Sequence, residues 1–274
     1  MVGKTQVMMR LALVACIWAG AAGPGQAAEV CTLIAQADSG VIAVERGACD
    51  RRVTPASTFK LALAVMGYDS GMLVDAGHPV FDYAPGDPDW GGADWTRATT
   101  PTRWLRYSVV WYSQRITRAM GADTLTRYAR AFSYGNADFS GDAGFDNGLE
   151  RAWIASSLLI SPREQVAFLR ALIADELPAS PRAMAQVRAI TQHHEAAGWR
   201  ISGKTGAAYP RRADQTFDYD RGWGWYVGWA EKDGTRIVFA RLTQDAARQD
   251  GSPGSRLRAQ TLASWPALMA AAGF

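Results

Sequence analysis

A serine and a lysine at helical spacing are the first residues whose types could do chemistry together. They form the motif Ser57-Thr58-Phe59-Lys60, at the start of an apolar, helix-forming segment that continues to Met66. The i, i+3 spacing places Ser57 and Lys60 on one helix face, about 5–6 Å apart at Cβ, so a base at Lys60 can reach the hydroxyl. Backbone N–H groups at a helix N-terminus can also stabilise an oxyanion. The pattern predicts a nucleophilic serine that contributes to its own oxyanion hole.

Lys60 is unusual because its sequence neighbours are apolar. It is followed by Leu61-Ala62-Leu63-Ala64, and the chain has only four lysines against twenty-five arginines. An unpaired ammonium among apolar side chains costs free energy, which favours a functional lysine. The alternative is a helix-capping serine with a solvent-exposed lysine one turn later.

A second lysine lies in Lys204-Thr205-Gly206, at the end of a predicted strand. Lysine and threonine can hold an anionic group, and glycine lets a ligand approach the strand closely. The alternative is an ordinary turn at the end of a strand. Ser-x-x-Lys and Lys-Thr-Gly occur together in penicillin-binding proteins and class A β-lactamases, with Ser-Asp-Asn as a third element, but this sequence has no Ser-Asp-Asn.

Other segments follow in a recognisable order. They are Ser108-Val109-Val110, Trp111-Tyr112-Ser113-Gln114, Tyr134-Gly135-Asn136, Trp153 ahead of Ile160-Ser161-Pro162, and the aromatic-rich segment 222–229. With the two lysine motifs, this set resembles the class D (oxacillinase-type) serine β-lactamases of the penicillin-binding, transpeptidase-like superfamily. The resemblance extends from Cys31 to the C-terminal helical segment. One departure is Ser156-Ser157, where the family often has Gly-Pro.

The resemblance implies that β-lactam antibiotics are hydrolysed through an acyl-enzyme on Ser57. The general base would be Lys60 carboxylated by carbon dioxide (N6-carboxylysine), with no other cofactor and no metal. Carboxylation needs a neutral amine, and lowering a lysine pKa from 10.4 to about 7 takes roughly 4–5 kcal/mol, which a dry pocket supplies. Val110 and Leu158 would form its walls, and the indole of Trp153 would hold the carbamate. Most tryptophans are simply core residues, and this is the alternative for Trp153.

The resemblance also assigns the remaining site residues. The backbone N–H groups of Ser57 and Ala207 would bind the oxyanion, while Ser108 and Lys204 would pass a proton to the leaving nitrogen. The substrate carboxylate would be held by Lys204-Thr205-Gly206 and an arginine of the C-terminal helix. That arginine is expected to be Arg258, with Arg256 as the alternative.

Two other functions share these motifs. One is a penicillin-sensing receptor domain that stays acylated, although such domains usually follow transmembrane helices. The other is a D,D-peptidase, whose third motif usually supplies an asparagine that Ser108-Val109-Val110 lacks. The His193-His194 pair is expected at the polar end of a helix, and neither a histidine triad nor metal-ligand spacing appears.

Strand patterns at the two ends of the chain enclose a helical middle. Strands are expected at 30–37, 41–45, 199–204, 222–231 and 236–242, with helices at 104–120, 122–132, 162–173 and 255–272. This order predicts an α/β (α+β) fold, in which a central antiparallel sheet is flanked by helices and carries an inserted all-helical lobe. The sheet lobe would comprise 28–67 and 197–274, the helical lobe 68–196, and the site would lie between them.

The N-terminus has the pattern of an export signal, which predicts a periplasmic protein. Residues 1–27 combine Lys4 and Arg10 with a short apolar run and a small-residue cleavage site, leaving a mature chain of 28–274. The run is too short to span a membrane. Lipid attachment at Cys16 is a minor alternative. Removing the leader lowers the formal net charge of +3 by two, which leaves the mature chain close to neutral. This charge gives no indication of a nucleic-acid partner.

Cys31 and Cys49 flank two alternating strands joined by a turn-forming Asp38-Ser39-Gly40. A hairpin centred on this turn brings the two cysteines nearly opposite one another. In an exported protein this favours a disulfide, and two buried free thiols are the alternative.

Overall fold

The computed structural model describes residues 27–274. The expected leader, apart from its last residue, and Cys16 lie outside this part of the chain. Within 27–274, no helix is both long enough and apolar enough to cross a bilayer.

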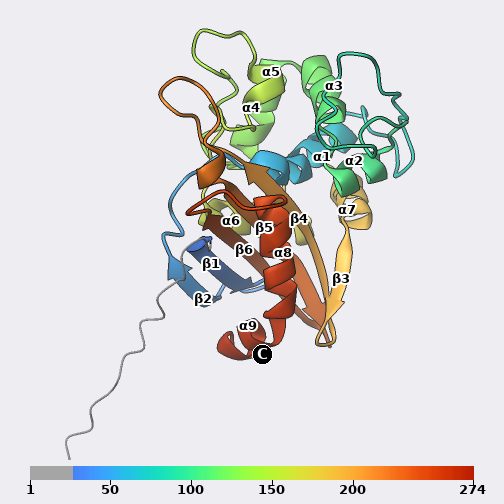
Figure 1. Ribbon diagram of the computed structural model, residues 1–274. Coiled ribbons are helices and arrows are strands. Elements are labelled where there is room, and N and C mark those ends of the chain that lie inside the picture. The colour runs from blue at the N-terminus through green and yellow to red at the C-terminus, as the bar shows by residue number, and fades with distance from the viewer. Residues whose placement is uncertain (1–26) are drawn as a thin grey trace, which may run out of the picture.

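The core of the fold is a six-stranded antiparallel sheet in the order β2-β1-β6-β5-β4-β3. The strands are β1 Ala28–Gln36, β2 Ile42–Gly47, β3 His193–Ala196, β4 Trp199–Ala208, β5 Trp223–Lys232 and β6 Thr235–Gln244. Pairing of β1 with β6 joins the two ends of the chain, as the sequence pattern predicted. The expected fold class is therefore confirmed (Figure 1).

Helices cover both faces of the sheet and form a lobe beside it (Figure 1). They are α1 Phe59–Asp69, α2 Pro101–Tyr107, α3 Val110–Met120, α4 Ala122–Ala131, α5 Gly148–Arg151, α6 Pro162–Ile173, α7 Pro181–Ile190, α8 Pro253–Ala263 and α9 Trp265–Ala271, with short 3-10 turns η1 Ala56–Thr58 and η2 Tyr219–Arg221. Helix α6, from within the stretch expected to form the helical lobe, packs against β1, β5 and β6.

Alternation along the strands divides the buried side chains between two cores. In β1, Leu33 and Ala35 face the larger core, which also contains α1 and α6, whereas Ile34 faces a smaller core with Trp265. Because α1 contributes to the larger core, the helix that carries Lys60 is buried along its length from Phe59 to Tyr68.

Two helices predicted as continuous are each broken in two. The 104–120 segment is interrupted at Ser108, whose left-handed backbone (φ 57°) ends α2 before α3 begins. The 255–272 segment is interrupted at Ser264, two residues before Pro266, which lacks the N–H that a continuing helix needs. The first break matters for function because it changes the direction in which Ser108 is presented.

The prediction that His193-His194 ends a helix is wrong. Helix α7 ends at Ile190, and His193 and His194 begin the edge strand β3, paired with Ser202 and Ile201 of β4. The turn between β3 and β4 is Ala197-Gly198, with φ values of 50° and 77°. Two consecutive left-handed residues favour a tight hairpin over a helix end.

The predicted disulfide is confirmed. Cys31 in β1 is bonded to Cys49, with the two Cα atoms 5.1 Å apart. The hairpin pairs Cys31 with Gly47, and Ala48 N–H then donates to Val30 O, which carries the chain back over β1. The alternative of two free thiols is thereby excluded.

Candidate active site

A cleft of about 590 Å³ opens where the helical lobe meets the sheet. Its walls come from η1, α2, the start of α3, β4 and the N-terminal end of α8. The lining residues are Ala56, Ser57, Trp90, Gly91, Trp95, Arg106, Tyr107, Ser108, Val110, Ile154, Thr205, Ala207, Tyr209, Ser252, Ser255 and Arg258. Six of these lining residues were predicted for the site, and they come from four separate parts of the chain. None of the lining residues is an aspartate or a glutamate.

Ser57 stands in the 3-10 turn η1, directly before α1, rather than in the first turn of α1 as expected. Ala56 before it has a left-handed backbone (φ 50°), a conformation that costs free energy for a non-glycine residue. This backbone turns Ser57 to the half-buried position from which it lines the cleft.

Lys60 is completely buried, and its Nζ has no hydrogen-bond partner among the described residues. Burial lowers the pKa of Lys60 well below its usual range, and the nearby charge of Lys204 lowers it further. Both effects favour the neutral amine over the ammonium.

Trp153 is also completely buried, and its indole Nε1 has no acceptor in the described chain. Its ring packs against Phe59, beside Lys60 in α1, with ring centroids 5.5 Å apart. Val110 and Leu158, the predicted walls, are buried as well. Leu158 does not line the cleft, whereas Val110 does. The unpartnered N–H donor of Trp153 thus belongs to a ring that packs on Phe59, the residue next to Lys60 in the chain.

Two residues fix the loop that carries Trp153. Thr54 Oγ1 donates to Trp153 O at 2.9 Å and accepts from Ala155 N–H at 3.0 Å. Asn136, from the Tyr134-Gly135-Asn136 motif, donates to Ser157 O at 2.8 Å and accepts from Leu159 N–H at 2.9 Å. The loop is therefore held from both sides although it has Ser156-Ser157 in place of Gly-Pro.

Lys204 links the two lobes by donating a hydrogen bond from Nζ to Ser108 Oγ. It also donates to Thr205 O at 3.0 Å. Burial, with a smaller effect from the guanidinium of Arg258, lowers the pKa of Lys204 to about 7. An amine with this pKa can give or take a proton at neutral pH.

The Lys204-Thr205-Gly206 motif lies inside β4, not at its end, because the strand continues to Ala208. Strand β3 pairs with β4 only from Trp199 to Ser202, so the rest of this edge has no partner strand. Thr205 and Ala207 line the cleft at this edge, while Gly206 does not.

Gly206 instead allows β4 to pack closely against the turn that carries Ser57. A Cβ at this position would lie 2.8 Å from Pro55 O and 3.1 Å from Thr58 Cγ2. Any larger residue would push β4 away from η1. The separation between the backbones of Ser57 and Ala207 depends on this contact.

The two candidate arginines of α8 have different environments. Arg256 is paired with the buried carboxylate of Asp245, at 2.6 and 2.8 Å, and also donates to the carbonyls of Asp250 and Gly251. Arg258 lines the cleft and has no ion-pair partner among the described residues. Only Arg258 is available for a ligand.

Sequence reasoning missed Gln165 and the role of Thr58. Gln165 in α6 is fully buried and donates to Thr58 Oγ1 at 2.7 Å, and Thr58 Oγ1 donates to Pro55 O at 2.7 Å. These bonds fix the turn that presents Ser57. The available signal was a glutamine on the apolar face of α6, one helical turn before Leu169.

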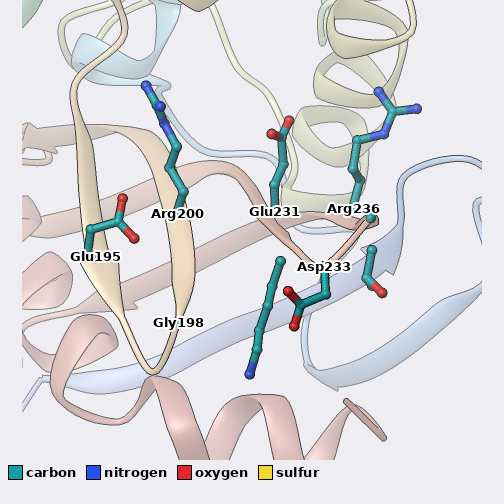
Figure 2. A pocket seen from close by; sticks show the side chains of 9 residues that line it. Glu195, Gly198, Arg200, Glu231, Asp233 and Arg236 are labelled. Atoms are coloured by element: carbon teal, nitrogen blue, oxygen red, sulfur yellow. The ribbon is translucent and has the colours of Figure 1, made fainter.

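A second hollow lies at the tips of the β3-β4 and β5-β6 hairpins, and Figure 2 shows its charged side chains. Glu231 pairs across the sheet with Arg200 on one side and Arg236 on the other. Opposite charges alternate here, which is typical of a solvated cross-strand ladder. None of the predicted site residues lines it, so the cleft is the candidate active site.

Known proteins similar to this chain show the family to which it belongs. Residues 26–263 match the family described as the penicillin binding protein transpeptidase domain. The chain is 43% identical to β-lactamase OXA-9 of Klebsiella pneumoniae over 241 residues, 87% of this chain and 88% of the relative. It is 34% identical to β-lactamase OXA-1 of Escherichia coli, over 77% and 74% of the two chains.

Solved structures agree. The crystal structure of OXA-427, a class D β-lactamase, matches with a TM-score of 0.80 and 40% identity, covering 88% of this chain and 99% of that one. The protein belongs to the class D β-lactamase family.

Replacing Thr58 by valine tests the buried support of the Ser57 turn. The change keeps the shape but removes the hydroxyl that accepts from Gln165 Nε2 and donates to Pro55 O, so we expect a loss of about 1–3 kcal/mol in unfolding free energy. Thr58→Ser keeps the hydroxyl and should lose clearly less. Denaturant unfolding of both variants measures this. Equal stability of Thr58→Val and wild type would contradict the assigned role.

Lys204→Met should stabilise the protein in a pH-dependent way. The pKa of Lys204 is about 7 in the folded protein but about 10.4 when unfolded, so the unfolded state binds more protons between these values. The buried amine of Lys204 therefore lowers the unfolding free energy most below pH 7, by at most about 5 kcal/mol. Above pH 10 it has no such effect, because the amine is neutral in both the folded and the unfolded state. We expect a Tm gain that is largest at pH 6 and shrinks toward pH 10. Exposed Lys232→Met is the control, and a gain independent of pH would count against the buried amine.

Proposed function

We propose that this protein hydrolyses β-lactam antibiotics through a covalent acyl-enzyme on Ser57 and so confers resistance to them. The observation that carries the proposal is a completely buried, unpartnered amine at Lys60, one helical turn after a serine that lines the cleft. Membership of the class D family supports it independently. The expected export signal fits the periplasm as its place of action.

A carboxylated Lys60 fits the described surroundings. Carbon dioxide adds only to a neutral amine, and burial lowers the pKa of Lys60, which favours the neutral form. The unpartnered N–H of Trp153 is a donor that accepts nothing, so it favours an anion nearby. When formed, the carbamate supplies an anionic oxygen as general base at neutral pH.

In acylation, Ser57 Oγ loses its proton to the base at Lys60 and bonds to the lactam carbonyl carbon. The backbone N–H groups of Ser57 and Ala207 hold the oxyanion. When the carbon–nitrogen bond breaks, the nitrogen takes a proton from Ser108 Oγ, which Lys204 replaces. A pKa of about 7 lets Lys204 supply that proton at neutral pH.

Before deacylation, the proton that the base took from Ser57 passes through solvent to Lys204, which restores both groups. A water molecule then gives its proton to the free base and attacks the Ser57 ester. The carbon–oxygen bond breaks, Ser57 recovers its proton, and the ring-opened acid leaves. Throughout the cycle, Arg258 binds the substrate carboxylate, with Thr205 and Lys204 beside it on β4. Arg258 suits this role because it has no other anionic partner in the described chain, unlike Arg256.

Turnover of a chromogenic cephalosporin separates hydrolysis from sensing. We expect linear product formation over many equivalents of enzyme, abolished in Ser57→Ala. A single stoichiometric burst would instead indicate a penicillin sensor. Release of D-alanine from peptide substrates, with no β-lactam turnover, would indicate a D,D-peptidase.

Removal of bicarbonate tests the base. Activity of degassed, bicarbonate-free enzyme should fall at least tenfold and return when bicarbonate is added, because carboxylation is reversible. Trp153→Phe, which loses the N–H donor, should need more bicarbonate for half-maximal activity. Carbon-13 NMR with labelled bicarbonate reports a carbamate signal that is absent in Lys60→Ala. Indifference of both enzymes to bicarbonate would contradict the assignment.

A further inference from the structure

The outer wall of the cleft carries an aromatic face and a cation that the proposed reaction does not use. We propose that Trp90 and Arg106 form a subsite for acyl side chains that bear an aromatic ring and a second carboxylate. The inference rests on the proposed function and adds to it a preferred substrate class, the dianionic aryl β-lactams.

Trp90 is an exposed indole that packs on Trp95, whose own position is fixed by hydrogen bonds. It lines the cleft with 62% of its surface exposed, and its ring lies 5.4 Å from that of buried Trp95. Trp95 Nε1 donates to Tyr107 O at 2.8 Å, and Trp95 O accepts from Trp111 Nε1 at 2.8 Å. Gly91 keeps the loop close, since a Cβ there would lie 2.0 Å from the Trp95 ring. A large exposed aromatic held in this way offers a face for stacking.

Arg106 supplies the cation. It lies in the last turn of α2, is exposed and lines the cleft. No carboxylate of the described chain pairs with it, whereas Arg103 on the same helix pairs with Asp94. The only cation–π contact of Arg106 among the described residues is with the Tyr107 ring, whose centroid lies 5.3 Å from the guanidinium carbon. Because no acidic residue lines the cleft, an anion bound there meets no like charge.

The two unpaired guanidiniums of the cleft lie on different lobes. Arg258 belongs to α8, which packs on the sheet, and Arg106 belongs to α2 of the helical lobe. In a penicillin, the ring carboxylate and the acylamino group project from opposite ends of the bicycle. With the ring carboxylate at Arg258 and the carbonyl at Ser57, the acyl side chain extends toward the α2 wall. A carboxylate on that side chain then reaches Arg106.

The matched substrates benzylpenicillin and α-carboxybenzylpenicillin differ only by the side-chain carboxylate. We expect Arg106→Gln to lower the ratio of their kcat/KM values (carboxylated over plain) about fivefold, the size of a solvent-exposed ion pair. Arg106→Lys should retain most of the ratio at low salt, and the wild-type ratio should fall as salt rises. Trp90→Ala should weaken both substrates alike, because both carry the phenyl ring.

Arg127→Gln is the control, since it removes an equally exposed charge on α4, outside the cleft. An unchanged ratio in Arg106→Gln, or an equal drop in Arg127→Gln, would overturn the proposal. Second-order acylation constants from intact-protein mass spectrometry give the same ratio without turnover. A protein that acylates but does not hydrolyse would refute the proposed function while still testing the subsite.

Discussion

The structure depends on one unfavourable arrangement, a lysine amine buried without a counter-charge from residues 27–274. In water Lys60 would be an ammonium, but burial in the core between α1 and its neighbours disfavours the charged form and lowers its pKa well below the usual range. Desolvation therefore favours the neutral amine, the form that can act as a nucleophile or base. The fold must supply this free energy from packing elsewhere, and the aromatic and aliphatic side chains around α1 provide it.

Precision at the site comes from contacts between elements that are distant in sequence. Gly206 lets β4 approach Pro55 O, and Gln165 of α6 holds Thr58 from the other side. Trp225 of β5 donates to Thr54 O at 2.9 Å, and Thr54 in turn holds the Trp153 loop. The turn that carries Ser57 is thus fixed by the sheet, by α6 and by the loop at once. Such redundancy is what a strained turn requires.

The site joins two regions with different physical character. The surroundings of Lys60 and Trp153, which do not line the cleft, are buried and apolar, and there small changes in polarity move a pKa. The walls of the cleft are open to solvent, with Arg258 on one lobe and Arg106 on the other, where charges attract anions but are screened. In the proposed function, chemistry belongs to the buried part and substrate selection to the exposed part. The link between them is Lys204, which is buried yet bonded to Ser108 across the lobes.

The sequence by itself predicted the fold class and the disulfide partners, because these follow from local spacing, alternation and composition. It also carried the motifs whose resemblance to a family implied the catalytic residues. It could not show that Ser108 breaks a helix, that His193 begins a strand, or that Arg256 is already paired with Asp245. Gln165, Trp90 and Arg106 also escaped it. Each of these depends on which side chains meet across distant segments, and a left-handed residue, an ion pair or a buried amide is selected by tertiary packing rather than by its neighbours in the chain.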